Sequence, residues 1–309
     1  ENRENREHRM TNYSHYRLAA NGIRFHIATP EQQGNGALVV LLHGFPEFWY
    51  SWRHQLPALS AAGYHVIAPD LRGYNDSEKP ARGYDILTLT NDIAAIVKAL
   101  RYSRAHIVGH DWGGVLAWTF AARFPNMTSK LVVMNAPHIA AYQRELRRNL
   151  AQWRKSWYVY FFQIPRLPET LLTRHHGAGI ARLLQRSANP TTFSPEDLAR
   201  YADAFCKPGA ATAALNWYRT AARQLHTLLP NRGRVAAPTL LLWGAQDIAL
   251  DLSLTLGLER WVPNLTVRIL PHASHWVQQD APEQVNRYLL DFLRSDPPLS
   301  RPSSPVVSK

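Results

Sequence analysis

The segment AHIVGHDWGG, residues Ala105–Gly114, joins an apolar strand pattern to a glycine-flanked aspartate and the start of a helical pattern. The small residues Gly109 and Gly113, two positions before and two after Asp111, permit a tight strand-to-helix turn that lifts the central side chain clear of a sheet. This is the arrangement of a nucleophile elbow, with Asp in the place where Ser is commoner. The segment therefore predicts a strand-helix fold with a functional carboxylate at the end of one strand.

An aspartate at this position changes the chemistry that the site can perform. A carboxylate is already ionised at neutral pH, and the N-terminus of the following helix favours its charged form. Asp111 can therefore displace a leaving group at a saturated carbon and form an alkyl-enzyme ester. This chemistry favours epoxides or alkyl halides as substrates over peptides or ordinary esters. The alternative is that Asp111 only caps the helix, since Asp is a favoured N-cap residue.

Short apolar runs alternate with helical patterns over much of the chain. The further runs are Ile23–Ala28, Leu38–His43, His65–Pro69, Lys130–Asn135, Thr239–Trp243 and Thr266–Leu270. The segments Asn91–Leu100 and Val115–Phe124 have the pattern of crossover helices between such strands. Brief strands with helices between them predict an α/β fold, in which a mostly parallel central sheet is flanked by helices.

The alternation stops between about Pro137 and Arg234, where the chain is helical in pattern and rich in aromatic residues and arginine. We predict a core formed by residues 18–137 and 234–297, with residues 138–233 inserted as a helical cap. Residues 1–17 are expected to be a polar N-terminal extension, and residues 298–309 a Pro/Ser-rich tail.

Composition narrows the class of protein. Cys206 is the only cysteine, which excludes a disulfide within the chain and a cysteine-based metal site. No apolar run is long enough to cross a bilayer, and the first ten residues have no signal-peptide core. We therefore expect a cytoplasmic protein without stable membrane insertion, either a monomer or a homodimer.

The net charge is +12, from 35 basic and 23 acidic residues. A basic surface can attract nucleic acid or anionic membrane, but no nucleic-acid-binding motif accompanies it, and we predict no nucleic-acid partner. The densest basic cluster is Arg144, Arg147, Arg148, Arg154 and Lys155. Leu146, Leu150 and Trp153 interrupt it at helical spacing, which predicts the solvated outer face of an amphipathic helix. A role of the basic cap at a membrane surface is the alternative.

The loop His43–Gly44–Phe45–Pro46 follows the apolar run ALVVLL. Such a loop can supply one backbone N–H to an oxyanion hole, and the residue after the nucleophile can supply a second. We expect the amides of Phe45 and Trp112 to hold the Asp111 carboxylate and later to stabilise a tetrahedral intermediate. An ordinary turn at Pro46 is the alternative.

The order of residues in a nucleophile-elbow enzyme predicts an acid and then a histidine further along the chain. Asp247 ends the run TLLLWGAQD just after a strand, and His275 follows the last strand in ILPHASHW. We predict that His275 is the general base for water and that Asp247 orients it. Asp251 is the rival acid and His272 the rival base.

An opened epoxide leaves an alkoxide that needs a proton, and tyrosine phenols stay protonated at neutral pH. The cap offers Tyr158 in SWYVYFFQIP and Tyr218 in LNWYR, although periodicity alone would place both in a core. Other cap aromatics are candidate pocket walls. These are Trp153, Tyr160 and Phe161, together with the residues that we assign to substrate binding, Trp157, Phe162 and Trp217.

The motifs HGFPE, GHDWGG, YVYFFQIP, LNWYR, GAQD and SHW occur in this order between about Leu18 and Phe292. In this combination the chain resembles the soluble epoxide hydrolases of the α/β-hydrolase superfamily. The resemblance implies the α/β-hydrolase fold with an inserted cap, and hydrolysis of a small apolar epoxide to a vicinal diol with water as the second substrate. It implies Asp111 as nucleophile, Asp247 and His275 as the acid and base, and Tyr158 and Tyr218 as the phenols that activate the epoxide oxygen. It also implies the Phe45 and Trp112 oxyanion amides, and no cofactor or metal.

Two neighbouring families share the aspartate elbow and remain alternatives. Haloalkane dehalogenases commonly have Asn after the His-Gly pair, where this chain has Phe45. Fluoroacetate dehalogenases have charged Arg residues near the nucleophile, where this chain has Trp112, and a His in the cap segment that here contains Tyr158. These differences favour the epoxide. A binding protein without catalytic activity is the alternative from another class, since fold does not fix function.

Overall fold

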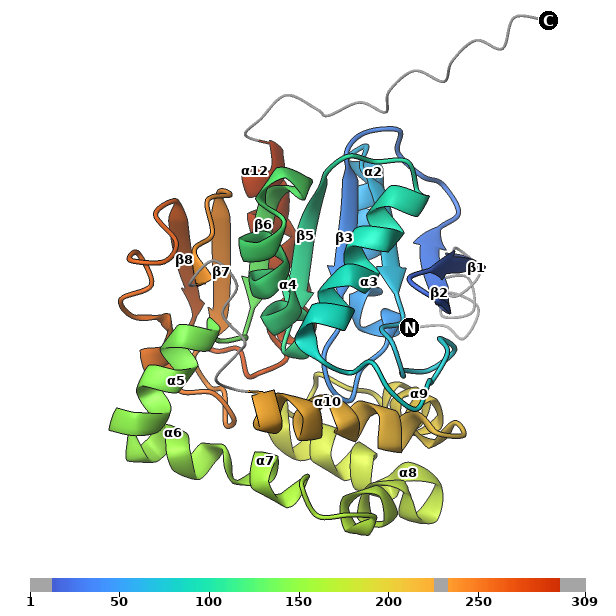
Figure 1. Ribbon diagram of the computed structural model, residues 1–309, viewed down its shortest axis with the longest axis vertical. Coiled ribbons are helices and arrows are strands. Elements are labelled where there is room, and N and C mark those ends of the chain that lie inside the picture. Colours follow the sequence, from blue (N-terminus) through green and yellow to red (C-terminus); the bar gives the residue numbers. More distant parts are fainter. Residues whose placement is uncertain (1–12, 225–232, 295–309) are drawn as a thin grey trace, which may run out of the picture.

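The computed structural model describes residues 13–224 and 233–294, which are organised around a central sheet of eight strands (Figure 1). The strand order is β1-β2-β4-β3-β5-β6-β7-β8. The bounds are β1 Tyr13–Ala20, β2 Ile23–Pro30, β3 Leu38–Leu42, β4 His65–Pro69, β5 Ala105–His110, β6 Thr128–Met134, β7 Thr239–Gly244 and β8 Leu265–Leu270. Strands β3 to β8 pair in parallel, whereas β1 with β2 and β2 with β4 are antiparallel. Each strand predicted from the sequence is present, and the predicted mostly parallel sheet is confirmed.

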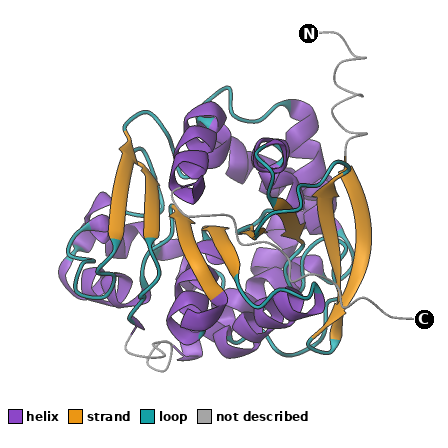
Figure 2. Cartoon of the chain, turned by 90° about the horizontal axis from the view of Figure 1, so that it is seen from above, coloured by secondary structure: helices purple, strands orange, loops and turns teal. Residues whose placement is uncertain are grey.

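The middle of the sheet is built from continuous apolar runs because both of its faces are covered. Every residue of β3, β5, β6 and β7 is buried. Helices α3 and α4 lie on one face and α2 and α12 on the other, so that the sheet runs between two helical layers (Figure 1, Figure 2). Their bounds are α2 Gln55–Ala61, α3 Ile86–Ala99, α4 Trp112–Arg123 and α12 Pro282–Arg294. Shorter helices are η1 Trp49–Trp52, η2 Pro125–Met127, η4 Leu252–Thr255 and α11 Val277–Asp280.

Strand β1 corrects the predicted N-terminal extension. Residues 13–17, which we expected to belong to a polar extension, pair with β2 from Tyr13 opposite Pro30 onward. The strand YSHYRLAA lies at the edge of the sheet, and several of its residues are exposed. An edge strand with one solvated face carries polar residues, and for that reason its sequence did not stand out from a polar segment.

The helices inserted between β6 and β7 lie across the edge of the sheet where the parallel strands end (Figure 1). They are α5 Ile139–Arg148, α6 Leu150–Lys155, α7 Trp157–Phe161, α8 Leu167–Ser187, α9 Pro195–Cys206 and α10 Ala210–Gln224. Helix α8 is interrupted by non-helical conformations from Arg174 to Gly177. These helices occupy the stretch predicted as the cap, and we propose that they form it.

The basic cluster was predicted to lie on one amphipathic helix, but the segment forms two helices, α5 and α6. The chain leaves helical geometry at Asn149, whose side chain accepts hydrogen bonds from the first amides of α6. This break resets the helical phase, so that spacing counted across it does not define one face. As a result Leu150 is 73% exposed and Trp153 51% exposed, instead of facing the protein.

Candidate active site

The backbone at Asp111 has the geometry of a nucleophile elbow. Asp111 follows β5 and precedes α4, with φ of 50° and ψ of −122°, a conformation that is strained for a residue with a side chain. A Cβ atom at Gly109 would lie 2.2 Å from the carbonyl oxygen of Gly113, and one at Gly113 would lie 2.1 Å from the carbonyl oxygen of Leu42. The two glycines that flank the predicted elbow are therefore required for the close approach of α4 to the sheet.

The loop after β3 reaches the carboxylate of Asp111. The Phe45 amide donates a hydrogen bond of 2.8 Å to Asp111 Oδ1. A Cβ atom at Gly44 would lie 2.4 Å from Asp111 Cβ, so only glycine lets this loop come so close. The second expected contact, a hydrogen bond from the Trp112 amide to the Asp111 carboxylate, is not formed in the described residues. Helix α4 begins with Trp112, directly after Asp111, so its amide could donate to a negatively charged oxygen formed there during a reaction.

The predicted acid and base lie together beside the carboxylate. His275 Nδ1 is 2.7 Å from Asp247 Oδ2, and His275 Nε2 is 3.5 Å from Asp111 Oδ2. The rival residues lie elsewhere: Asp251 accepts the Ser253 amide as the N-cap of η4, and His272 is exposed. Of the two acids and two histidines that the sequence left open, Asp247 and His275 are the ones that lie beside Asp111.

The Asp247 carboxylate is held in its ionised form. Burial acts to raise its pKa, but the charge of His275 and several hydrogen bonds outweigh burial and lower the pKa. The Asn135 side chain donates to Oδ2 at 2.7 Å, and the amides of Ala249 and Leu250 donate to Oδ1 at 2.7 and 2.9 Å. Four donors therefore fix this carboxylate under the imidazole of His275.

The imidazole of His275 is under the influence of two carboxylates. Burial acts to lower its pKa, but the charge of Asp247 and the hydrogen bond and charge of Asp111 outweigh burial and hold the pKa well above its usual value. Consequently His275 is protonated while Asp111 is ionised. Loss of the negative charge on Asp111 would remove part of this effect and lower the pKa of His275.

A buried ion pair beside His275 was missed in the sequence. His110 Nδ1 is 2.7 Å from Glu47 Oε2, and His110 Nε2 is 2.8 Å from the backbone carbonyl oxygen of His275. Burial acts to raise the pKa of Glu47, but His110 and the Gly44 amide outweigh burial and lower the pKa to about 2. Because the ionised Glu47 and the carbonyl group can only accept, both ring nitrogens of His110 must donate. His110 is therefore a buried cation that fixes the backbone of His275.

A cavity of about 240 Å³ connects the carboxylate with the cap. Asp111 lines it from the core, and Tyr158 and Tyr218 line it from α7 and α10. The two phenol rings are 6.0 Å apart between centroids and nearly perpendicular. Burial, with smaller contributions from neighbours that include Asp111, raises the pKa of both phenols well above the usual value. Both phenols therefore stay protonated and can donate hydrogen bonds into the cavity.

Comparisons with known proteins bear on the family to which this chain belongs. Residues 37–282 match the family described as alpha/beta hydrolase fold. Epoxide hydrolase 3 of Xenopus tropicalis is 39% identical over 293 residues, which are 92% of this chain and 78% of that protein. The AB hydrolase superfamily protein YfhM of Bacillus subtilis is 39% identical over 277 residues, 89% of this chain and 96% of that protein. The crystal structure of the Bacillus megaterium epoxide hydrolase in complex with an inhibitor matches with a TM-score of 0.83 and 33% identity, over 91% of this chain and all of that one.

The chain belongs to the epoxide hydrolase family of alpha/beta hydrolases. In this epoxide hydrolase family member the pocket walls differ from those that we expected. Trp217 lines the cavity, whereas Phe162 is buried behind it against Phe45 and Tyr218. Trp157 is 64% exposed and is not part of the cavity lining, so its assignment to substrate binding is wrong. Because a five-residue helix has only one face against the core, Tyr158 lies in the cavity lining while Trp157, the residue before it, points to solvent.

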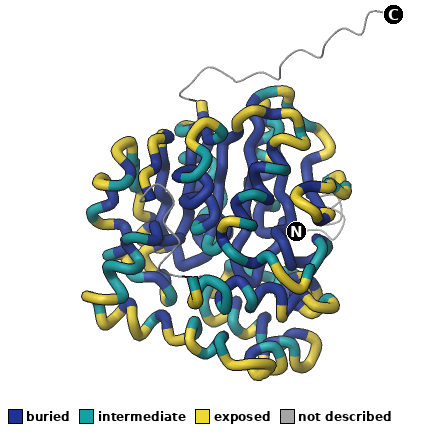
Figure 3. Tube along the Cα trace, in the orientation of Figure 1, coloured by how far each residue is buried: buried dark blue, intermediate teal, exposed yellow. Residues whose placement is uncertain are grey.

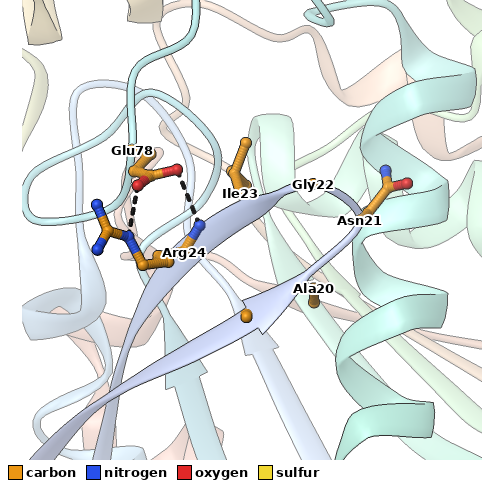
Figure 4. A pocket seen from close by; sticks show the side chains of 7 residues that line it. Ala20, Asn21, Gly22, Ile23, Arg24 and Glu78 are labelled. Carbon is orange, nitrogen blue, oxygen red and sulfur yellow. Dashed lines mark hydrogen bonds and ion pairs between the residues drawn. The ribbon is translucent and has the colours of Figure 1, made fainter.

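Two other features of the described residues lack this combination of groups. A shallow depression at the β1–β2 turn is lined by residues 19–24 and Glu78, and its charged pair, Arg24 with Glu78, is exposed (Figure 4). His26, Asp70 and Asp76 place possible metal ligands within 4.8 Å of one another. However, Asp70 already accepts hydrogen bonds from His26, from Asn75 and from the Trp49 amide, so its oxygens are engaged. Among the described residues, only the cavity at Asp111 joins a nucleophile, a base and proton donors.

Proposed function

We propose that the protein hydrolyses a small apolar epoxide to a vicinal diol, through an alkyl-enzyme ester on Asp111. The observation that carries this proposal is that one cavity is lined by Asp111 on one side and by the phenols of Tyr158 and Tyr218 on the other. A carboxylate opposite two proton donors suits a strained ring that must be attacked at carbon while its oxygen acquires a proton. The remaining cavity wall is mostly apolar, which suits an apolar substrate.

In the first half-reaction the two phenols donate hydrogen bonds to the epoxide oxygen. An Asp111 oxygen attacks a ring carbon, a carbon–oxygen bond to Asp111 forms, and the ring carbon–oxygen bond breaks. The electron pair of the broken bond stays on the substrate oxygen, which takes a proton from a phenol. Raised pKa values keep both phenols protonated until that moment.

In the second half-reaction a water molecule attacks the carbonyl carbon of the Asp111 ester, and His275 takes its proton. Formation of the ester has removed the negative charge of Asp111, and the pKa of His275 therefore falls from its raised value. The ester thus converts a protonated His275 into a base once its proton has passed to the phenolate or to solvent. The Phe45 and Trp112 amides stabilise the tetrahedral oxyanion. Its collapse breaks the ester carbon–oxygen bond to the substrate, and the leaving alkoxide takes the proton of the new Asp111 carboxyl group, which releases the diol and restores the Asp111 carboxylate.

A dehalogenase with the same Asp, His and Asp residues is the alternative, and one observation weighs against it. Halide release needs polar N–H donors that point at the leaving group. The Trp217 indole N–H instead donates to the backbone carbonyl oxygen of Arg72 at 3.1 Å. The Trp112 indole also lines the cavity, and its N–H donates to the phenol oxygen of Tyr218. The phenols of Tyr158 and Tyr218 serve an oxygen that needs a proton better than a halide that needs none.

The test is to incubate the purified protein with styrene oxide, trans-stilbene oxide, a haloalkane and fluoroacetate, and to measure diol and halide together. We expect diol from at least one epoxide, and none from the Asp111→Ala variant. Halide without diol would assign the protein to the dehalogenases. Diol formation that survives Asp111→Ala would exclude Asp111 as the nucleophile.

A further inference from the structure

Large apolar side chains gather on the outer surface of the cap. Of the twelve large hydrophobic residues that are exposed in the described part of the chain, seven lie between residues 150 and 171. They are Leu150, Trp153, Trp157, Tyr160, Ile164, Leu167 and Leu171. We call residues 150–171 the cap ridge; helices α6 and α7 and the start of α8 form it, along the margin of the molecule farthest from the sheet (Figure 1, Figure 3). Exposed apolar residues that cluster in this way mark an interaction surface.

The cap ridge is bordered by unneutralised positive charge. Arg147 and Arg148 end α5, Arg154 lies within α6, and Arg166 precedes α8; all four are exposed. In residues 13–224 and 233–294 none of these four forms an ion pair. The acidic residues nearby are already paired: Glu145 with Arg144, Glu169 with Arg219, and Asp251 with Lys155. The ridge therefore presents aromatic and aliphatic side chains within a basic border.

We propose that the cap ridge docks this protein on the surface of an anionic phospholipid bilayer. Tryptophan and tyrosine have an apolar body and a polar tip, which suits the boundary between head groups and acyl chains. Arginines beside them are attracted by anionic head groups. No helix of the described residues has the length and apolarity to span a bilayer. A surface helix that combines aromatic residues with arginine is typical of such interfacial binding.

The charge of the ridge favours an anionic bilayer over a second copy of the chain as its partner. In a two-fold dimer through the ridge the same patch would meet itself, which would bring Arg147, Arg148 and Arg154 of both copies together. Like charges opposed across a contact are unfavourable. An anionic surface neutralises the same arginines, and it accommodates exposed side chains without a complementary groove.

The position of the ridge has a consequence for the reaction, which rests on the proposed function. Tyr160 belongs to the ridge, at 56% exposed, and also lines the cavity that contains Asp111. Docking would therefore place the cavity wall at the bilayer, where an apolar epoxide accumulates. The docking itself does not depend on the reaction and is tested without it.

The test is flotation of the full chain with two kinds of vesicle. One contains phosphatidylcholine alone, and the other also contains about 30 mol% phosphatidylglycerol. We expect binding only to the anionic vesicles, weakened by salt. Arg147→Gln with Arg148→Gln should lower the partition coefficient roughly thirtyfold, because each surface arginine contributes about 1 kcal/mol. The matched control is Arg101→Gln with Arg104→Gln, which removes the same charge from the exposed loop before β5 and should retain most of the binding. Circular dichroism establishes that each variant is folded.

The apolar side chains are tested separately. Trp153→Ser with Trp157→Ser should also abolish most of the binding, whereas Leu87→Ser with Ile269→Ser, at exposed positions outside the cap, should not. Equal losses in the two arginine pairs would overturn the proposal, since binding would then follow net charge alone. Retention of binding by the tryptophan pair would overturn it as well. A wild-type dimer in solution that separates on Trp153→Ser with Trp157→Ser would assign the ridge to a contact between two copies of the chain instead.

Discussion

The ion pair between Glu47 and His110 gives a prediction whose size can be worked out from the structure. Glu47→Gln keeps the shape of the side chain but removes the charge that balances His110, with both groups fully buried. A folded-state pKa of about 2, against about 4.3 in an unfolded chain, corresponds to about 3 kcal/mol of stability. Breaking a buried ion pair by removing one partner costs about 3–5 kcal/mol. The two routes agree, and the loss is a large part of the about 5–15 kcal/mol that stabilises a typical domain.

The direction of the pH dependence follows from the lowered pKa. The ionised Glu47 contributes its stabilisation fully above about pH 4.3, and this contribution is lost as the pH falls through the folded-state pKa of about 2. The difference in free energy of unfolding between the wild type and Glu47→Gln should therefore be largest near neutral pH. It should shrink as the pH falls below about 4.

Urea unfolding of both proteins at neutral pH and near pH 3 measures this difference. Glu259→Gln, at an exposed position, is the matched control and should cost less than about 0.5 kcal/mol. In a His110→Asn background, Glu47→Gln should cost much less than in the wild type, because the charge that it leaves unbalanced is already gone. A cost below about 1 kcal/mol at neutral pH, or one that does not change with pH, would refute the argument for a buried cation at His110.

Three further predictions concern the proposed reaction. His275→Gln should slow ester hydrolysis more than alkylation, so that mass spectrometry of a single turnover finds a substrate adduct on Asp111; a wild-type-like burst without adduct would contradict the two-step scheme. Tyr158→Phe and Tyr218→Phe should each lower kcat/KM by about 10- to 100-fold, and the double variant should lose clearly more than either single one, since the phenols act on one oxygen; a double variant no worse than a single one would remove the paired role. Gly113→Ala should prevent folding or abolish turnover, because its Cβ would lie 2.1 Å from a backbone oxygen of β3, and normal activity with normal stability would show that the elbow tolerates a shift.

Much of the fold could be predicted because the strands in the middle of the sheet have a clear hydrophobic pattern in the sequence. The runs at β3, β5, β6 and β7 are uniformly apolar since both faces of those strands are buried. Strand β1 has no such run, because an edge strand with a solvated face needs only a few apolar residues at its buried positions. The sequence-based boundary at residue 17 therefore fell within a strand.

The candidate site was predictable where a residue type follows a strand end in a fixed order. Asp111, Asp247 and His275 were predicted in this way. In the structure His275 lies between the two carboxylates, 2.7 Å from Asp247 and 3.5 Å from Asp111. Glu47 and His110 stand in the quoted motifs HGFPE and GHDWGG. Their contact joins positions 63 residues apart, and neither residue shows by its type or spacing that the other is its partner.

The cap aromatics show the opposite limit. Trp157 and Tyr158 are neighbours in sequence, yet Trp157 is largely exposed while Tyr158 lines the cavity. Consecutive residues on a helix point about 100° apart, so the assignment of one of them to the cavity depends on the phase of a single helical turn. The break at Asn149 and the short helices α6 and α7 make that phase unreadable from the sequence.

One short segment of α6 joins the cap to the loop that carries Asp247. This contact links the residues of the two proposed half-reactions. Gln152 of α6 accepts the Asp251 amide at 2.7 Å and donates to the Ala249 carbonyl oxygen at 3.2 Å. Lys155 donates to the backbone carbonyl oxygen of Asp247 at 3.0 Å. Tyr158 follows three residues later, on the next helix. The segment that positions a phenol over the cavity therefore also clamps the loop that carries Asp247, so that a displacement of α6 would disturb epoxide activation and the orientation of His275 together. Gln152→Ala should accordingly impair both half-reactions in pre-steady-state measurements, whereas an effect on only one of them would show that the two are positioned independently.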